Sequence, residues 1–358
     1  MQLPYRQYTC VLGESPRLAD SAAAIGRTSA GARLTLLEYA TVRADGEFIR
    51  IGRDAWLAER ATVHIVDGQI GTTIGDEVTV GRYALVHACT LGNRVVVGEG
   101  AAVMDGAMVG DDVVVAADSI VAPGKQLPGG WLYQGVPAQP LRQIAPSEAA
   151  AIARSIRDGA PDDIVRSAVL PPLSVRAFLP AGAGAGPLHS WLGRSPHIGA
   201  AYVAPTAAVI GKVELRDDAG IYFGCVVSAG DGRIVIGPRT NVQDNSFLIT
   251  SAARGDLVLG AGITIGHNVQ MRSGRFGDDA LIGMMSRLED DVVVEAQGCV
   301  AAGAWVASGT VVKSGWIWAG RPARAFRELR PAERVQFARG RDVYIGYGAA
   351  YRAALAPR

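Results

Sequence analysis

Apolar residues recur along this chain at a spacing of six. Ile74 and Val80 are six residues apart, and the interval resumes at Leu91 and continues through Val97, Val103, Val109, Val115 and Val121. Glycine directly follows many of these positions, as Gly75, Gly81, Gly92, Gly98 and Gly110. A period of six fits neither an amphipathic helix nor a simple alternating strand. It is typical of a hexapeptide β-helix, in which short parallel strands are joined by tight turns.

The second half of the chain repeats the first at a fixed offset. The segment Gly135-Val136-Pro137-Ala138 returns as Gly320-Arg321-Pro322-Ala323, a difference of 185. The same difference relates Trp131 to Trp316, Gly52 to Gly237 and Pro146 to Pro331. The apolar period returns as well, through Leu259, Ile265, Met271, Phe276, Ile282, Leu288, Val294, Val300, Val306 and Val312. The chain is therefore a tandem duplication with nothing inserted between these points.

The duplication and the period together predict the fold. In a hexapeptide coil the apolar side chains point into a triangular prism, and Gly, Asp or Asn adopts the backbone geometry of the corners. Three strands make one coil, so about eighteen residues advance the solenoid by one layer. We therefore expect a mainly β protein of two tandem left-handed parallel β-helix prisms, at about residues 20–140 and 197–325. Each prism should be followed by an α-helix, over Ser147 to Asp158 and from near Pro331 to about Ala354.

Composition divides the chain into three parts. Residues 161–196 contain Pro171-Pro172 and an alternating Ala/Gly run at 181–186, which favours a flexible connector. We expect a first β-helix domain with its trailing helix at 1–160, the connector at 161–196, and a second such domain at 197–358.

Charge and cysteine content exclude several classes of function. The balance of 35 basic against 34 acidic residues gives no electrostatic case for binding nucleic acid or an anionic membrane. No stretch reaches the roughly 18 apolar residues that cross a bilayer, and the amino terminus has no apolar run of signal-peptide length, so we expect a cytoplasmic protein. The cysteines, Cys10, Cys89, Cys225 and Cys299, have no CxxC spacing and are expected to be small buried thiols.

The histidines are divided unequally between the two copies. At the offset of 185, His64 falls on Ile249 and His87 falls on Arg272. Conversely, His267 falls on Arg82. Wherever one copy has a histidine of this set, the other has lost it. This division indicates either a single shared site or the decay of two older sites.

The sequence motifs around these histidines resemble those of a known family. Ile51-Gly52, His64 twelve residues after that glycine, Ile74-Gly75-Asp76, Val80-Gly81 and Val86-His87-Ala88-Cys89-Thr90 are similar to the gamma-class carbonic anhydrases and their acyltransferase-like relatives. The second copy is similar through 240–246 and through Ile265-Gly266-His267. The resemblance covers both prisms and both trailing helices.

The resemblance implies a metal site shared between two prisms. In that family three histidines hold zinc or a similar ion, two from one prism and the third from its neighbour in a trimer. The resemblance places His64 and His87 at the first two ligand positions and His267 at the third. Only a His64/His87 face packed against a His267 face rebuilds three imidazoles, the ligand number of a catalytic zinc that keeps a position for water. We expect at most one ion per pair of domains, zinc or another divalent metal such as iron or cobalt.

Other family positions are divided in the same way. Arg43 and Asp45 match an Arg-x-Asp pair that bridges adjacent prisms, and we expect a structural salt bridge there. Asn241 and Gln243 match residues that orient the metal-bound water, and they are the candidate catalytic residues. In a composite interface we expect Gln243 on the face away from the metal. The first-copy counterparts are Trp56 and Ala58, and Trp56 would crowd the pocket.

The leading hypothesis is a divergent gamma-carbonic anhydrase-like metalloprotein, in which zinc-activated hydroxide attacks carbon dioxide or a related small carbonyl. A CoA-dependent hexapeptide acyltransferase, with a histidine as general base, and a non-catalytic scaffold with a decayed metal site remain the alternatives. The histidines themselves could equally be inherited interface residues that bind no metal. As partners we expect a small-molecule substrate and further copies of the chain, packed like the prisms of a trimer.

Overall fold

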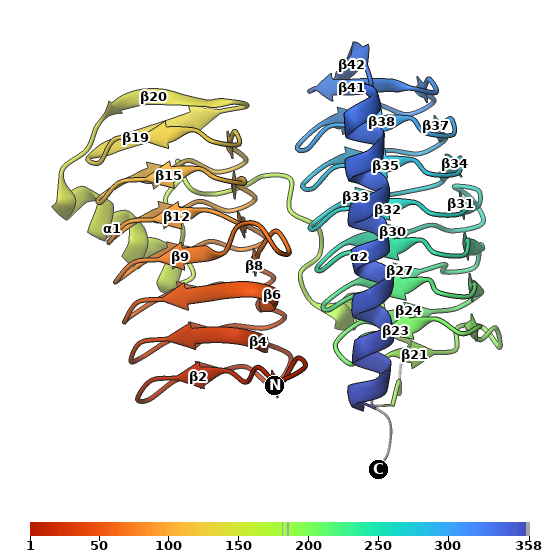
Figure 1. Ribbon diagram of the computed structural model, residues 1–358, viewed down its shortest axis with the longest axis horizontal. Coiled ribbons are helices and arrows are strands. Elements are labelled where there is room, and N and C mark those ends of the chain that lie inside the picture. The colour runs from red at the N-terminus through yellow and green to blue at the C-terminus, as the bar shows by residue number, and fades with distance from the viewer. Residues whose placement is uncertain (181, 185, 356–358) are drawn as a thin grey trace. The chain divides into compact units, whose positions relative to one another are not determined.

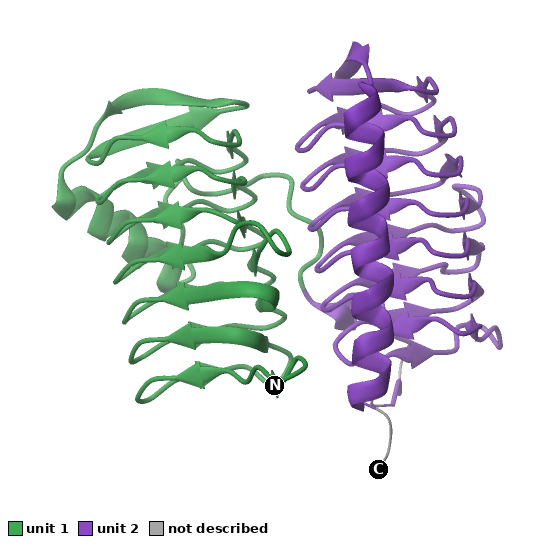
Figure 2. Ribbon diagram, in the orientation of Figure 1, with its two compact units in different colours: residues 1–173 green, residues 174–358 purple. Residues whose placement is uncertain are grey.

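The computed structural model describes residues 1–180, 182–184 and 186–355, and these form two compact units. Unit 1 comprises Met1–Leu173 and unit 2 comprises Ser174–Arg358 (Figure 2). The expected connector at 161–196 is thus divided between the two units after Leu173. Its first part lies on unit 1, where the backbone N–H of Ala117 donates to the carbonyl of Ile164 at 2.9 Å.

Unit 1 is a triangular parallel β-helix with one strand on each side per coil (Figure 1). Two sides are joined by long strands that bend round a corner, β4 (Ala23–Ala30) and β6 (Thr41–Ile51). One of these sides continues through β8 (Thr62–His64), β11 (Leu85–His87), β14 (Ala102–Val103) and β17 (Ile120–Val121), with β1 (Gln2–Leu3) at its start. The other continues through β9 (Thr72–Ile74), β12 (Thr90–Leu91), β15 (Met108–Val109) and β18 (Gln126–Leu127), with β2 (Val11–Leu12) at its start.

The third side of unit 1 carries its trailing helix. It consists of β3 (Arg17–Leu18), β5 (Thr35–Leu36), β7 (Trp56–Leu57), β10 (Thr79–Val80), β13 (Val96–Val97), β16 (Val114–Val115), β19 (Trp131–Gly135) and the antiparallel β20 (Ala138–Gln143). Helix α1 (Pro146–Arg157) packs on β10 and β13.

Unit 2 has three separate sheets. The first consists of β21 (Leu188–His189), β24 (Ala208–Ile210), β27 (Val226–Ser228), β30 (Phe247–Ile249), β33 (Gln270–Met271), β36 (Arg287–Leu288) and β39 (Trp305–Val306). The second consists of β22 (His197–Ile198), β25 (Val213–Leu215), β28 (Ile234–Ile236), β31 (Leu257–Leu259), β34 (Gly274–Phe276), β37 (Val292–Val294) and β40 (Val311–Val312). A short 3₁₀ helix, η1 (Val175–Ala177), precedes these coils.

The third sheet of unit 2 is the one that its trailing helix covers. It consists of β23 (Tyr202–Val203), β26 (Gly220–Ile221), β29 (Asn241–Val242), β32 (Thr264–Ile265), β35 (Leu281–Ile282), β38 (Cys299–Val300), β41 (Trp316–Gly320) and the antiparallel β42 (Ala323–Glu328). Helix α2 (Pro331–Leu355) packs on β23, β26 and β29 (Figure 1). The predicted fold of two left-handed parallel β-helices, each with a trailing helix, is confirmed.

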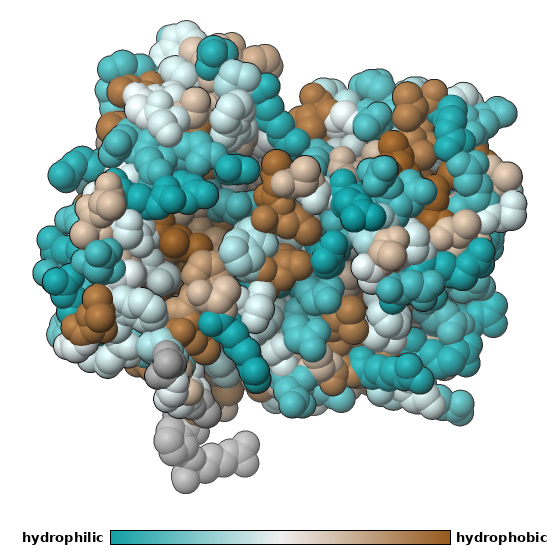
Figure 3. All heavy atoms as spheres, turned by 180° about the vertical axis from the view of Figure 1, so that it is seen from behind, coloured by the Kyte–Doolittle hydropathy of each residue, from teal (hydrophilic) through white to brown (hydrophobic). Residues whose placement is uncertain are grey.

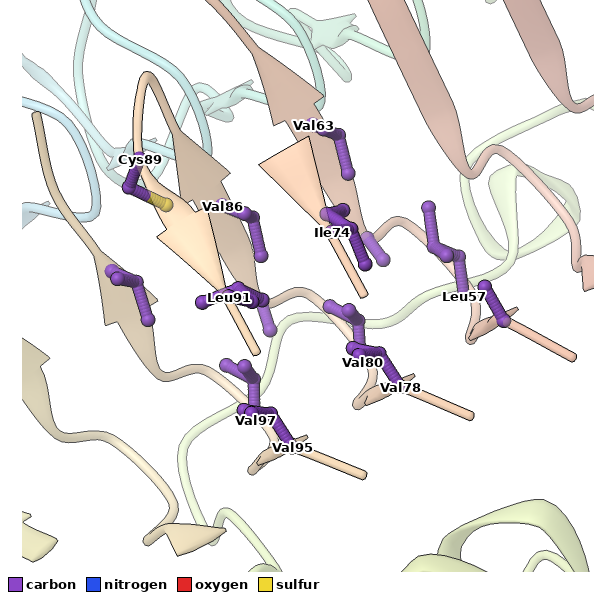
Figure 4. Packing of buried hydrophobic residues seen from close by; sticks show 14 of the residues in the cluster. Leu57, Val63, Ile74, Val78, Val80, Val86, Cys89, Leu91, Val95 and Val97 are labelled. Carbon is purple, nitrogen blue, oxygen red and sulfur yellow. The ribbon is translucent and has the colours of Figure 1, made fainter. Parts of the chain in front are cut away.

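The six-residue period produces the core directly. Along the third side of unit 1, Leu57, Val80 and Val97 lie in register on β7, β10 and β13, and all are buried. Figure 4 shows these side chains pointing into the prism, with the Cys89 thiol among them. Because each coil presents the same inward positions, the core grows by stacking. Cys89, Cys225 and Cys299 are buried and Cys10 is half-buried, with no disulfide among the described residues.

The first coil of unit 1 begins earlier than the sequence pattern indicates. Strands β1, β2 and β3 lie within residues 1–20, before the expected start of the prism. This segment lacks the spaced Val and Gly signature, but its strands still pair in parallel with β4 and β5. Backbone pairing with the strands of the next coil therefore holds this first coil in place, although its sequence lacks the hydrophobic pattern.

On the face drawn in Figure 3, hydrophobic residues are scattered among hydrophilic ones, as is usual for globular proteins. Among the described residues, neither helix is both long enough and apolar enough to cross a bilayer.

Candidate metal centre

His64 and His87 lie side by side on unit 1. They end β8 and β11, which pair in parallel so that the two histidines are in register. Their rings are 5.3 Å apart between centroids, and His64 Nδ1 lies 3.3 Å from His87 Nε2. Both side chains are buried. The predicted proximity of the two histidines on one face is therefore present within unit 1.

The nitrogen separation fits two ligands of one ion. Two nitrogens bound tetrahedrally at about 2.0–2.1 Å from zinc lie about 3.3 Å from each other. The same separation also lets one ring donate a hydrogen bond to the other while no ion is bound. The pair is thus already spaced for a metal without rearrangement of the coil.

A carboxylate lies against the far side of each ring. His87 Nδ1 lies 2.5 Å from Asp105 Oδ1, and Asp105 belongs to the next coil, 18 residues further along. His64 Nε2 lies 3.5 Å from Asp45 Oδ2. A carboxylate on the second nitrogen fixes the orientation of a metal-binding imidazole and increases its basicity. Asp105 lies in this position at His87, and no motif in the sequence pointed to it.

Arg43 and Asp45 form the expected ion pair. Both lie on β6, both side chains are fully buried, and Arg43 Nη1 donates to Asp45 Oδ2. Because a buried charge is costly unless it is paired, the two residues neutralise each other beneath His64. The pair positions the Asp45 carboxylate beside the histidine.

His267 is held in unit 2 by two polar neighbours. It follows β32, and its Nδ1 lies 3.2 Å from Asp244 Oδ2 in the preceding coil. Its Nε2 lies 3.1 Å from the hydroxyl of Tyr344, which comes from α2. The other oxygen of Asp244 accepts from the backbone N–H of Phe223 at 3.0 Å, so the carboxylate is fixed by the coil itself. The ring of His267 is therefore oriented from both sides.

Tyr344 is the second residue that sequence analysis missed. Its counterpart at the offset of 185 is Gly159, which follows the end of α1, so the duplication gave no signal for it. The hydroxyl of Tyr222 donates to the backbone carbonyl of Tyr344. That contact fixes this turn of α2 over the sheet and places the phenol beside His267.

Asn241 and Gln243 also lie on the His267 side of unit 2. Asn241 is in β29, the strand next to β32, and Gln243 Nε2 donates to Asn241 Oδ1 at 3.2 Å. Asn241 Nδ2 in turn donates to Thr264 Oγ1 at 3.0 Å. Both amides are buried. Gln243 follows β29, and its backbone N–H donates to the carbonyl of Ile265 at 2.9 Å, two residues before His267. That Gln243 lies on the face away from the metal stays a prediction.

The counterpart of His267 in unit 1 has been converted into a salt bridge. Arg82 Nε lies 2.6 Å from Glu99 Oε1, and Glu99 is buried. The other Glu99 oxygen accepts from the backbone N–H of Ser167 at 3.0 Å. In unit 2, Arg272 at the His87 position pairs with Glu289 at 3.1 Å. An arginine ion pair therefore occupies the His267 position in unit 1 and the His87 position in unit 2, while Ile249 occupies the His64 position.

The remaining histidines are separate from this set. His189 ends β21 and is buried, while His197 starts β22 and is exposed. They lie at the beginning of unit 2, far along the solenoid from His267 in coil order.

Comparison with known proteins defines the class. The fold is that of a hexapeptide-repeat protein. The chain matches no family model. It is 32% identical over 167 residues to a carbonic anhydrase of Geobacillus kaustophilus, covering 46% of this chain and 91% of that protein. It is 33% identical over 156 residues to protein YrdA of Escherichia coli, covering 40% and 85%. The chain belongs to the gamma carbonic anhydrase family.

Plant relatives and solved structures extend the comparison. Gamma carbonic anhydrase 1, mitochondrial, of Arabidopsis thaliana is 39% identical over 140 residues, which are 37% of this chain and 50% of that protein. The chain thus spans about half the length of the plant proteins it matches. A hexapeptide transferase family protein from Anaplasma phagocytophilum has a TM-score of 0.44 at 34% identity, covering 46% of this chain and 98% of that one.

Proposed function

We propose that this chain forms a composite metal site and hydrates carbon dioxide or attacks a related small carbonyl there. The site would combine a unit 1 face carrying His64 and His87 with a unit 2 face carrying His267. The observation that carries the proposal is the complementary division of the site residues. Unit 1 retains Arg43 and Asp45 with its two histidines, and unit 2 retains the amides with its one.

The donor set fits the ion that the family implies. Three neutral imidazoles are the ligands of a catalytic zinc with an open fourth position, and iron or cobalt accept the same ligands. A divalent ion held in this way supplies a bound water whose pKa is lowered to about 7, and hence a nucleophile at neutral pH. His64 and His87 are already 3.3 Å apart at their facing nitrogens.

The surrounding side chains would have distinct tasks. Asp105 holds the Nδ1 side of His87 and keeps its Nε2 directed at His64. Asp244 performs the equivalent task at Nδ1 of His267, and at Nε2 the ion would take the place of the Tyr344 hydroxyl. The Gln243 amide, fixed by Asn241, and the Tyr344 hydroxyl are the polar groups that would orient a small polar substrate on the unit 2 side.

Homotypic faces do not support the same chemistry. Two unit 1 faces would set Arg82 opposite the His64/His87 pair, and a guanidinium offers no lone pair to a metal. Two unit 2 faces would offer only one imidazole each. One ion per chain is therefore the expected stoichiometry, with the composite faces contributed by one chain or by two copies.

Elemental analysis of chain purified without chelator tests the proposal. We expect about one divalent ion per chain in the wild type, and its loss in both His64→Ala and His267→Ala. His197→Ala, at an exposed histidine in unit 2, is the matched control and should keep the ion. Retention of metal in either ligand variant, or no metal in a chain supplied with zinc, would contradict the composite site.

Mixing the two ligand variants locates the partner face. If the faces come from two copies of the chain, unfolding and refolding His64→Ala together with His267→Ala restores part of the metal binding, because some interfaces then join two intact faces. If they come from one chain, no metal returns. Carbon dioxide hydration by stopped flow is the companion assay. Metal without hydration would favour another small carbonyl as the substrate, whereas no metal in the wild type would leave the acyltransferase and scaffold alternatives.

A further inference from the structure

A cavity lies under the first half of α2 in unit 2. It encloses about 290 Å³ between this helix and strands β32, β35 and β38. Its apolar lining consists of Leu281 and Cys299 on the strand side, with Leu329 before the helix and Phe337 on the helix itself. Its rim carries two arginines from α2, Arg334 and Arg341.

In unit 1, the position equivalent to this cavity is filled by apolar side chains of α1. At the offset of 185, Arg334 corresponds to Ala149 and Arg341 to Ile156. In unit 1 both of these are buried with Ile152 in a closed cluster against Val96 and Val114. Unit 1 therefore serves as an internal comparison, in which the equivalent face of the helix packs directly against the equivalent strands.

In unit 2 this face of the helix is not closed. Arg334 is exposed and Phe337 and Arg341 are only half-buried. The residues that α2 buries come later, at Tyr344, Tyr347, Gly348 and Tyr351. The first half of the helix therefore spans the cavity, while the second half anchors it to the sheet.

The polar contacts next to the cavity also differ between the two units. In unit 1, Arg94 and Asp112 pair with each other at 2.7 Å on the strand side. Their unit 2 counterparts are Asp279 and Gln297, and these bind the helix arginines instead.

The charge at the rim is unbalanced. Arg341 pairs with Asp279 and Asp342, so its charge is compensated. Arg334 Nη1 donates to the neutral amide oxygen of Gln297, and no carboxylate pairs with it among the described residues. The cavity lining carries two arginines and one aspartate, and it is positive by one charge.

We propose that this cavity binds a small organic carboxylate, with the carboxylate at Arg334 and an apolar body on Leu281, Cys299 and Phe337. A monoanion matches the single uncompensated charge, and the planar guanidinium suits a carboxylate. The cavity is at the small end of ligand sites, so the ligand has the size of a benzoate or a six-carbon acid. The inference does not depend on the metal site.

Calorimetric titration of the full chain with benzoate tests the proposal. We expect saturable binding that Arg334→Ala weakens by about tenfold or more, the value of one charge-assisted hydrogen bond. Arg339→Ala removes an exposed arginine of the same helix outside the cavity and should leave the affinity unchanged. Benzyl alcohol, which has the same shape without the charge, should bind about tenfold more weakly as well.

A second variant tests the cavity itself. Cys299→Leu adds apolar volume to the lining and should abolish benzoate binding while the thermal unfolding temperature is maintained. No saturable binding to the wild type would overturn the proposal. Equal binding by the Arg334→Ala and Arg339→Ala variants, or tighter binding of phenyl phosphate than of benzoate, would overturn it too.

Discussion

Arg82 donates from its Nε to Oε1 of the buried Glu99 at 2.6 Å, at the position where the second copy carries His267. The pair closes this side of unit 1, because the other Glu99 oxygen also accepts from the backbone of Ser167. At this position unit 1 therefore has a salt bridge whose Glu99 also holds the chain segment that follows α1.

The Arg82–Glu99 pair gives a first prediction about stability. Arg82→Met should lower the free energy of unfolding of unit 1 by about 2 kcal/mol, because it leaves a buried carboxylate without its cation. Urea unfolding followed by circular dichroism measures this. Arg94→Met, which breaks the more exposed pair with Asp112, is the control and should cost less than about 1 kcal/mol. Adding Glu99→Gln to Arg82→Met should recover much of the loss, and no recovery would show that packing rather than charge is responsible.

Asp105 gives a second prediction, about metal affinity. Asp105→Asn removes the carboxylate that holds His87 Nδ1 and should weaken metal binding by about 10–100-fold. Competition with a zinc-binding dye measures the affinity. Asp290→Asn is the matched control, since Asp290 is the counterpart in unit 2 and binds Arg254 and Ser273 instead of a histidine. Equal effects of the two substitutions would count against the role of Asp105.

Tyr344 gives a third prediction, about turnover. Tyr344→Phe should reduce carbon dioxide hydration by about tenfold, the equivalent of one hydrogen bond in the transition state. Metal content and fold should be retained, because Tyr222 binds the backbone of residue 344 and not its hydroxyl. Tyr347→Phe, three residues further along α2, should leave the rate unchanged. A loss of metal in Tyr344→Phe would instead assign the hydroxyl to holding His267.

Glu333 gives a fourth prediction, about pH. Its side-chain bonds to Arg327, together with the backbone N–H of Arg330, lower the pKa of this carboxyl from 4.5 to about 2. A lowered pKa means that the ionised form is the stabilising one. The contribution of Glu333 should be complete above about pH 4.5 and disappear as the pH falls toward 2. The stability difference between wild type and Glu333→Gln, followed over this range, should shrink accordingly; a constant difference would contradict it.

The architecture could be predicted because it follows from a local rule. Inward positions such as Val97 and Val115 repeat every coil, and a helix after Pro146 and Pro331 follows from composition and caps. The helix bounds differ from expectation by about one residue, Pro146–Arg157 and Pro331–Leu355. The first coil was missed because residues 1–20 pair with β4 and β5 without carrying the pattern.

The candidate site could be predicted only in part. His64, His87 and His267 stood out because the duplication placed a different residue opposite each of them. Asp105 did not, since its counterpart Asp290 is also an aspartate and only the coil geometry sets it against a histidine. Tyr344 reaches the site from a helix, whose side-chain directions the six-residue period does not describe.

The offset of 185 holds for the strands as well as for the sequence. Strands β7, β8 and β10 begin 185 residues before β29, β30 and β32, and α1 begins 185 residues before α2. In a stacked coil, an inserted or deleted residue would turn inward side chains outward in every strand up to the next corner. Within the coils, the two copies therefore differ by the exchange of one side chain for another at fixed sites. A gene of this kind can acquire new functions by substitution alone, without a change in length. A difference in side chains between its two halves can likewise be reversed by changing single codons.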